Sequence, residues 1–282
     1  MRDRPAIKTS VRVNSLKKLI RKKGIVRIIE VHNGLSAILA EEISLTQNKQ
    51  RLSFDGFWES SLTDSSSKGL PDIELVTTDS RLQTIHQILD VTSKPLIVDG
   101  DTGGDIHQFR HFVRRLEQAG VSMVIIEDKM FPKRNSFANV THNLEKTTVF
   151  AEKITAGSKA KQHKDFMIIA RLEGLIVGED MMSTVKRAEL FLQAGADGIM
   201  IHSKEKNPTK ILTFAKQYYK LPPELIKNKV LISVPTTYNT ITGEELKKAG
   251  FHVVIYANHQ LRAAYVAMEE VTKQILISDR GL

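Results

Sequence analysis

The sequence predicts a closed (β/α)8 barrel of the TIM type. Its 282 residues are 41% hydrophobic and 26% charged, which is the balance of a globular chain. Eight short runs of aliphatic and β-branched residues alternate with stretches of helical periodicity, as repeated βα units require. Three helical stretches end at Gly120, Gly195 and Gly250, where glycine suits a left-handed helix end. Eight units fit one domain of this length, and a doubly wound open sheet is the alternative.

The first predicted unit, residues 1–24, is a basic leader with a docking helix. It holds nine Lys and Arg and one Asp, so most of the net charge of +9 lies here. We expect a helix over 14–24, capped by Asn14 or Ser15 and ended by Gly24. A transit peptide is the alternative interpretation of this acid-poor segment. Because the charge is confined to one end, the sequence does not predict nucleic-acid binding.

The remaining residues, 25–282, are predicted to form a single barrel domain. Three polar stretches, 44–55, 61–71 and 130–145, are expected to be irregular loops, and long loops in a barrel are usually functional. An amphipathic helix over 260–277 ends the barrel. The eight strands are expected at 26–32, 56–60, 95–99, 122–127, 166–171, 198–202, 230–234 and 252–256.

Composition excludes several classes of protein. The chain has no cysteine, which removes disulfide frameworks, thiolate zinc sites and cysteine nucleophiles. No apolar run reaches the roughly 18 residues of a membrane span, and no secretory signal is recognisable. A cytoplasmic protein that associates with neither a membrane nor a nucleic acid is the expectation.

Acidic side chains end two successive predicted strands. Asp99 and Asp101 follow the third strand, and Glu127 ends the fourth. Carboxylates at one depth of a barrel repel each other unless a cation neutralises them. Oxygen ligands without cysteine suit Mg²⁺, for which Mn²⁺ is the natural substitute. The sequence therefore predicts a Mg²⁺ site at the barrel mouth.

Two basic side chains end later strands. Arg171 and His202 should face the acidic cluster from the other side of the mouth. Each has a structural alternative, Arg171 as a partner of Glu173 and His202 as a core histidine. Together with a metal, a guanidinium and an imidazole form a site for a phosphate or carboxylate. A small anionic substrate is expected.

These residues lie in segments whose order resembles the phosphoenolpyruvate mutase family of the isocitrate lyase superfamily, over nearly the whole chain. The family rearranges phosphoenolpyruvate to phosphonopyruvate and so makes a C–P bond. The segments that carry the resemblance are Val31-His32-Asn33-Gly34-Leu35-Ser36-Ala37, Asp99-Gly100-Asp101-Thr102-Gly103, Glu127-Asp128-Lys129, Asn135-Ser136, Ala170-Arg171-Leu172-Glu173, Ile201-His202-Ser203 and Tyr256-Ala257-Asn258.

The resemblance assigns the metal and its surroundings. It implies that Asp99 is the direct Mg²⁺ ligand, whereas Asp72, Asp101 and Glu127 contact the ion largely through water. Asp72 could instead be a nucleophile that carries the phosphoryl group, although direct transfer is favoured. A loose, metaphosphate-like transfer needs no covalent nucleophile.

The resemblance also assigns the groups that bind substrate. Arg171 and His202 match the positions that hold the phosphoryl group, and Lys133 and Asn135 lie on the mobile loop that closes over it. Closure would exclude water from a reactive intermediate. Many relatives have glycine at positions 59 and 61, so the turn geometry there is open. The stretch that binds the pyruvyl end comprises Trp58, Ser60, Ser61 and Leu62, with Ser136 on the loop.

Three alternatives to a mutase remain. Phosphonopyruvate hydrolase shares the barrel and differs mainly in the loop, where Asn135 favours the mutase. The lyases of the superfamily use a loop cysteine, which this chain lacks. An inactive barrel would have lost part of the acidic and basic set. The resemblance further implies a homodimer or homotetramer in which the last helix is swapped between subunits.

Overall fold

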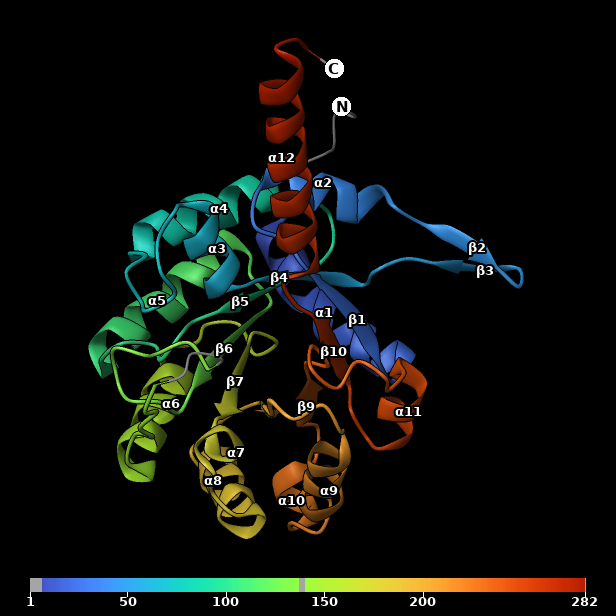
Figure 1. The fold of residues 1–282 in the computed structure, drawn as a ribbon. Coiled ribbons are helices and arrows are strands. Elements are labelled where there is room, and N and C mark those ends of the chain that lie inside the picture. The colour runs from blue at the N-terminus through green and yellow to red at the C-terminus, as the bar shows by residue number, and fades with distance from the viewer. Residues whose placement is uncertain (1–6, 137–139, 282) are drawn as a thin grey trace.

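The computed structural model is a closed barrel of eight parallel strands wrapped by helices (Figure 1). It describes residues 7–136 and 140–281. Each barrel strand pairs with the barrel strand that follows it along the chain, and the last pairs with the first. The predicted barrel and all eight predicted strands are therefore confirmed, and the open sheet is wrong. The strands are β1 Val26–Glu30, β4 Gly56–Glu59, β5 Leu96–Asp99, β6 Met123–Glu127, β7 Met167–Leu172, β8 Gly198–Ile201, β9 Val230–Ser233 and β10 Val253–Tyr256.

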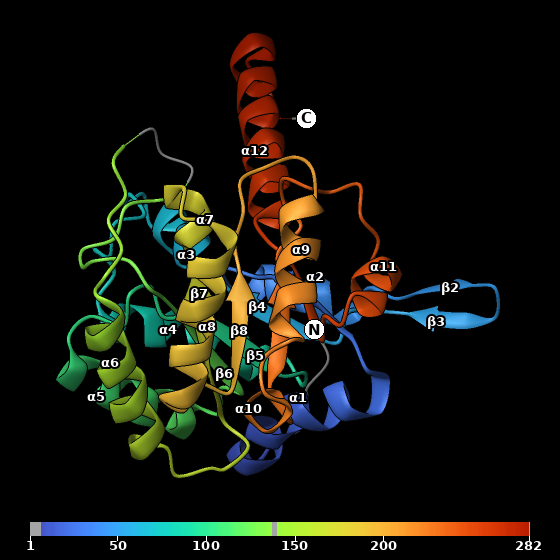
Figure 2. The same cartoon turned by 90° about the horizontal axis from the view of Figure 1, so that it is seen from below.

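Helices follow the strands around the outside of the barrel, as the view in Figure 2 also shows. The predicted glycine ends are found, since Gly120, Gly195 and Gly250 all have positive φ. The helices are α1 Thr9–Lys23, α2 Gly34–Glu42, α3 Ser61–Ser67, α4 Thr78–Val91, α5 Ile106–Ala119, α6 Thr147–Ala160, α7 Gly174–Val177, α8 Met181–Gln193, α9 Thr209–Tyr218, α10 Pro223–Ile226, α11 Gly243–Lys248 and α12 His259–Ser278.

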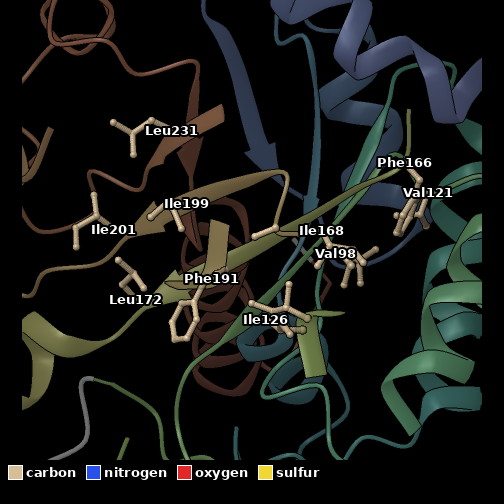
Figure 3. Close-up of a cluster of buried hydrophobic side chains, with 14 of the residues drawn as sticks. Val98, Val121, Ile126, Phe166, Ile168, Leu172, Phe191, Ile199, Ile201 and Leu231 are labelled. Atoms are coloured by element: carbon tan, nitrogen blue, oxygen red, sulfur yellow. The ribbon is translucent and has the colours of Figure 1, made fainter. Parts of the chain in front are cut away.

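Two layers of apolar side chains hold the barrel. The outer layer lies between strands and helices and includes Val98, Ile126 and Phe191 (Figure 3). The inner layer fills the barrel itself with alternate strand residues such as Ile125 and Ile169. Because successive residues of a strand face opposite sides, the inward-facing positions continue at the carboxyl ends into the polar residues of the mouth.

Helix α1 closes the amino end of the barrel, which we call the floor. It begins at Thr9 rather than at Asn14 or Ser15, so the predicted cap is wrong. The helix extends because Arg12 is buried and donates hydrogen bonds to the carbonyls of Leu89 (3.0 Å) and Thr92 (2.8 Å). These contacts offset the absence of a capping side chain. Gly24 ends the helix as expected, and the first part of the leader, residues 1–6, lies outside the described residues.

The polar stretch 44–55 is a β-hairpin rather than an irregular loop. Its strands, β2 Leu45–Gln47 and β3 Gln50–Leu52, are antiparallel and extend sideways from the barrel in Figure 1. Asn48 and Lys49 both have positive φ, which is the geometry of a two-residue hairpin turn. The usual Asn-Gly signal is missing here, so the turn was not predicted.

The stretch 61–71 also differs from the prediction, because its first half is helix α3. Serine and threonine are weak helix formers, and the sequence therefore resembles a loop. Burial decides otherwise: Asp64 is fully buried and accepts a hydrogen bond from Thr84 of α4 at 2.7 Å. Tertiary contacts thus override the local preference of the segment.

The last helix, α12, stands away from the barrel in both views (Figures 1 and 2). All of its residues are at least partly exposed, including large apolar ones such as Tyr265 at 65% and Ile277 at 78%. A helix packed on its own barrel would bury one face, and α12 does not. Within the described part of the chain, no helix is long and apolar enough to span a membrane.

Candidate active site

One pocket at the carboxyl ends of the strands collects twelve of the thirteen predicted site residues. The pocket has a volume of about 60 Å³ in this structure. Asp101 is the exception: it lies behind Asp99 and lines a neighbouring cavity with Glu74. The twelve are Trp58, Ser60, Ser61, Leu62, Asp72, Asp99, Glu127, Lys133, Asn135, Ser136, Arg171 and His202.

Neighbouring strands place an acid beside a base in this pocket. Glu127 at the end of β6 is in register with Arg171 of β7, and their side chains form an ion pair. A second nitrogen of Arg171, Nη1, lies 3.7 Å from Oδ2 of Asp99. Arg171 thus connects two of the acids that the sequence assigned to the metal.

Glu173 joins the two predicted phosphoryl-binding residues. Its Oε1 accepts hydrogen bonds from Nε of Arg171 at 2.6 Å and from Nδ1 of His202 at 2.7 Å. Its Oε2 accepts one from Ser136 at 2.7 Å. Burial raises the pKa of Glu173, but Arg171 and His202 lower it further, so the pKa lies well below its usual range. An ionised Glu173 can only accept, which fixes the proton of His202 on Nδ1.

The loop after β6 contributes a lysine that contacts three other segments. Nζ of Lys133 lies 2.8 Å from Asp72 and 2.6 Å from Asp101, and it donates to Ser61 at 2.6 Å. Asn135 of the same loop donates from Nδ2 to Asp72 at 2.7 Å. The backbone N–H of Lys133 donates to Glu74. The described part of the loop is therefore fastened over the pocket.

Two charged groups of the pocket, Glu127 and Lys133, have strongly shifted pKa values. Burial raises the pKa of Glu127 to about 7, although Arg171 pulls it down. Burial lowers the pKa of Lys133, but Asp101 and Asp99 outweigh it and raise the pKa above its ordinary value. Perturbed groups that share one pocket are typical of functional sites.

The structure defines the geometry of the turn after β4, which the sequence left open at positions 59 and 61. Glu59 is fully buried and does not line the pocket, because strand alternation directs it outward beneath α4. Ser61 does line it, and its hydroxyl donates to Oδ2 of Asp99 at 2.9 Å. Glu59 therefore takes no part in the pocket wall, whereas Ser61 contributes a polar contact to it.

The donor set at the mouth matches a hard divalent cation in chemistry. Asp99 and Glu127 offer buried carboxylate oxygens, and Oε1 of Glu127 accepts no hydrogen bond from any described residue. Yet no three His, Asp or Glu side chains in residues 7–136 and 140–281 converge as ligands of one ion. Lys133 and Arg171 each bridge two of the carboxylates instead.

Three contacting residues were not predicted as part of the site. Glu173 was named from the sequence only as the structural partner of Arg171, a pair that the structure shows; it follows Arg171 by two residues and so faces the same side of the strand. Lys129, whose Nζ is 3.3 Å from Glu173, lies in a quoted motif but had no assigned role. Arg81, buried on α4, gives no signal, since one arginine in an amphipathic helix resembles a surface residue.

A (β/α)8 barrel whose mouth holds paired acids and bases in one small pocket defines a class of enzymes that act on small anions. The chain belongs to the phosphoenolpyruvate phosphomutase family, because the sequence model of that family matches residues 16–276. The family predicted from the sequence motifs is thereby confirmed.

Individual relatives agree with this assignment. The chain is 36% identical to phosphoenolpyruvate phosphomutase from Tetrahymena pyriformis over 266 residues, 94% of this chain and 83% of the relative. It is similar to the crystal structure of the phosphomutase from Streptomyces platensis subsp. rosaceus, with 39% identity, a TM-score of 0.86 and coverage of 95% and 88%. A phosphonopyruvate hydrolase in complex with oxalate and Mg²⁺ has 32% identity, a TM-score of 0.81 and coverage of 97% and 88%. The comparisons favour the mutase over the hydrolase.

Proposed function

We propose that the protein is a Mg²⁺-dependent phosphoenolpyruvate mutase. It would interconvert phosphoenolpyruvate and phosphonopyruvate by intramolecular phosphoryl transfer between oxygen and carbon, the entry step to phosphonates. The observation that carries this proposal is the pairing of Asn135 with Asp72 at 2.7 Å, which fastens the loop over a pocket that also contains Arg171 and His202. A closed loop keeps water from the migrating group and so favours its return to substrate.

Arg171 and His202 bind the migrating phosphoryl group in this proposal. The guanidinium presents several donors to phosphoryl oxygens, and Glu173 holds it and the imidazole in fixed orientations. Fixed donors cost no reorganisation during the transfer. Glu173 is thus a positioning residue for both.

The acids at the opposite wall would hold the metal. Asp99 is the proposed direct ligand, with Asp72, Asp101 and Glu127 as supporting acceptors. Bound there, Mg²⁺, or Mn²⁺ in its place, would supply positive charge beside the oxygen from which the phosphoryl group departs. The related hydrolase complex with oxalate and Mg²⁺ supports this choice of ion. Lys133 contacts two of the same acids, Asp72 and Asp101, so the loop lysine and the ion would share these carboxylates.

The rest of the pocket would bind the pyruvyl end of the substrate. Ser60 and Ser61 precede and begin α3, and both line the pocket, so their hydroxyls and backbone N–H groups would be the donors to the substrate carboxylate. Trp58 and Leu62 supply the apolar wall beside them, and Ser136 closes the side nearest Glu173. Asp72 contacts both Lys133 and Asn135, which supports a role in holding the loop over the pocket. A carboxylate with these two partners favours direct transfer over a phosphorylated aspartate.

Phosphorus-31 NMR with Mg²⁺ and phosphonopyruvate tests the function. Conversion to phosphoenolpyruvate is the expected result. Release of inorganic phosphate would instead make the protein a phosphonopyruvate hydrolase and Asn135 an unreliable marker. An unchanged spectrum, with a known mutase active in parallel, would reject both.

We further propose a cytoplasmic homodimer or homotetramer in which α12 packs against the partner subunit. The exposed apolar residues of α12, among them Tyr265 and Ile277, need a cover in water. Neither a membrane nor a nucleic acid is part of this proposal. Sedimentation of the wild-type chain should give a dimer or a larger oligomer. The variant Tyr265→Asp should shift this equilibrium toward the monomer. A monomeric wild type would reject the packing of α12 against a partner subunit.

A further inference from the structure

We infer that Arg81 is a positioning residue that sets the metal-binding acids from behind, an inference that rests on the proposed function. Arg81 belongs to α4, outside the barrel, and is only 3% exposed. It does not line the pocket. Its guanidinium reaches inward to the end of β5, where the first acids of the mouth begin.

Each arm of the guanidinium contacts one of two acidic residues, Asp99 and Asp101, which are separated by Gly100. Nη1 donates to the backbone carbonyl of Asp99. Nη2 donates to Oδ2 of Asp101 at 2.7 Å. A planar fork that bridges a carbonyl and a carboxylate fixes the distance between them, which a flexible lysine cannot do.

Asp101 depends on this support because its backbone is strained. Its φ is +53°, a conformation that side chains other than glycine rarely adopt. The backbone N–H of Asp101 donates to Oδ1 of Asp99 at 3.1 Å, and its carbonyl accepts from the N–H of Glu127 at 2.8 Å. Asp101 therefore links Asp99 and Glu127, two of the other three proposed metal acids, and Arg81 holds Asp101 in place.

Glu59 completes the arrangement behind Arg81. Its Oε2 lies 3.8 Å from Nη1 of Arg81, and neither carboxylate oxygen receives a hydrogen bond from the residues that the structure describes. Asp64, also buried, already has Lys68 and Thr84 as partners. Arg81 thus lies between Glu59 on one side and Asp101 on the other, and its contact with Asp101 keeps the guanidinium in one place.

Ion affinity measured without substrate tests the inference. Titration of the full chain with Mn²⁺, followed by electron paramagnetic resonance, should give a dissociation constant at least about 10-fold weaker for Arg81→Gln and Arg81→Lys than for wild type, the usual cost of losing a partner of a metal ligand. Arg81→Lys keeps the buried charge, so it decides the matter if Arg81→Gln does not fold.

The matched control is Arg12, an arginine of the floor that is also buried, at 6% exposure, and also donates to backbone carbonyls. Arg12→Gln and Arg12→Lys should lower the melting temperature but bind Mn²⁺ within about twofold of wild type. In addition, excess Mg²⁺ should restore kcat of Arg81→Lys, which a merely structural role would not allow.

Wild-type affinity in both Arg81 variants would overturn the inference. Equal losses in the Arg12 variants, or no Mn²⁺ binding by the wild type, would do the same. A wild type that binds Mn²⁺ but leaves phosphonopyruvate unchanged would reject the proposed function. The Mn²⁺ affinities of the Arg81 variants would then still decide whether Arg81 positions the metal-binding acids.

Discussion

The two ends of the barrel are built on opposite principles. The floor is apolar: Leu16 and Ile20 of α1 pack into the inner layer beside Val26 and Val253. The mouth is ionic, and its buried acids and bases form a connected network in which Lys133 and Arg171 each contact several carboxylates. Burying apolar surface stabilises the fold directly, whereas a buried ion pair roughly offsets its own desolvation. Stability should therefore come mainly from the floor and reactivity from the mouth.

Even the buried arginines follow this division. Arg12 at the floor donates to neutral carbonyls, whereas Arg171 at the mouth contacts three carboxylates. A substitution at the floor should change unfolding and spare turnover. A substitution at the mouth should do the reverse.

The largest effect is expected at Asp99. Asp99→Asn removes the charge of the proposed metal ligand while retaining its shape, so kcat/KM should fall at least about 10³-fold. The melting temperature should stay close to that of wild type. Steady-state kinetics over a range of Mg²⁺ concentrations and thermal unfolding check this, with exposed Asp90→Asn as the control. Unchanged turnover with an unchanged Mg²⁺ requirement would end the assignment.

Leu16→Ala should produce the opposite result. Leu16 is fully buried against the strands of the floor, and its truncation leaves a cavity. The free energy of unfolding should drop by about 2–5 kcal/mol, with KM unchanged. Urea unfolding measures the loss, and Val11→Ala, at an exposed position of the same helix, should cost little. A change in KM as large as the change in stability would break the division between the ends.

A smaller effect on activity is expected at the loop. Asn135→Ala removes the hydrogen bond to Asp72 but no charge, so kcat/KM should fall about 10- to 100-fold through poorer closure. Asn143→Ala, at an exposed position further along the loop, is the control for loop perturbation. If Asn135→Ala retained full turnover, the loop residue would have no gating role.

The smallest effect concerns pH and lies at the floor. Burial lowers the pKa of His252 below the ordinary histidine value of about 6.5, and its Nδ1 accepts a hydrogen bond from the N–H of Leu231 at 3.1 Å. Below that value the unfolded chain binds more protons than the folded one, so stability falls as pH falls, by no more than about 1.4 kcal/mol per unit. His252→Gln should flatten this slope in urea unfolding at about pH 5.5 and 7.5. An identical slope in the variant would exclude His252 as its source.

Sequence reasoning located the strands and most of the pocket because both depend on local order. Inward-facing residues at the ends of parallel strands must meet, so Asp99, Glu127, Arg171 and His202 could be placed together without coordinates. It failed for contacts between distant segments. The burial of Arg81 beneath the barrel wall depends on how α4 packs, and no local pattern reports that.

The same limit explains the errors at element boundaries. The α1 helix begins early because Arg12 meets carbonyls about eighty positions away in the sequence, and no capping motif marks that start. Helix α3 forms from residues of poor helical preference because Asp64 is buried under α4. In both cases tertiary contacts outweigh local preference.

The aromatic wall of the pocket gives the protein an optical property. Trp58 is the only tryptophan in the chain, is 3% exposed, and lies in the same pocket as Arg171 and Lys133. Indole emission responds to nearby charge and to solvent, so all the tryptophan fluorescence of the molecule originates at one wall of the site. Ligand entry and loop motion can therefore be followed in real time without attaching a dye.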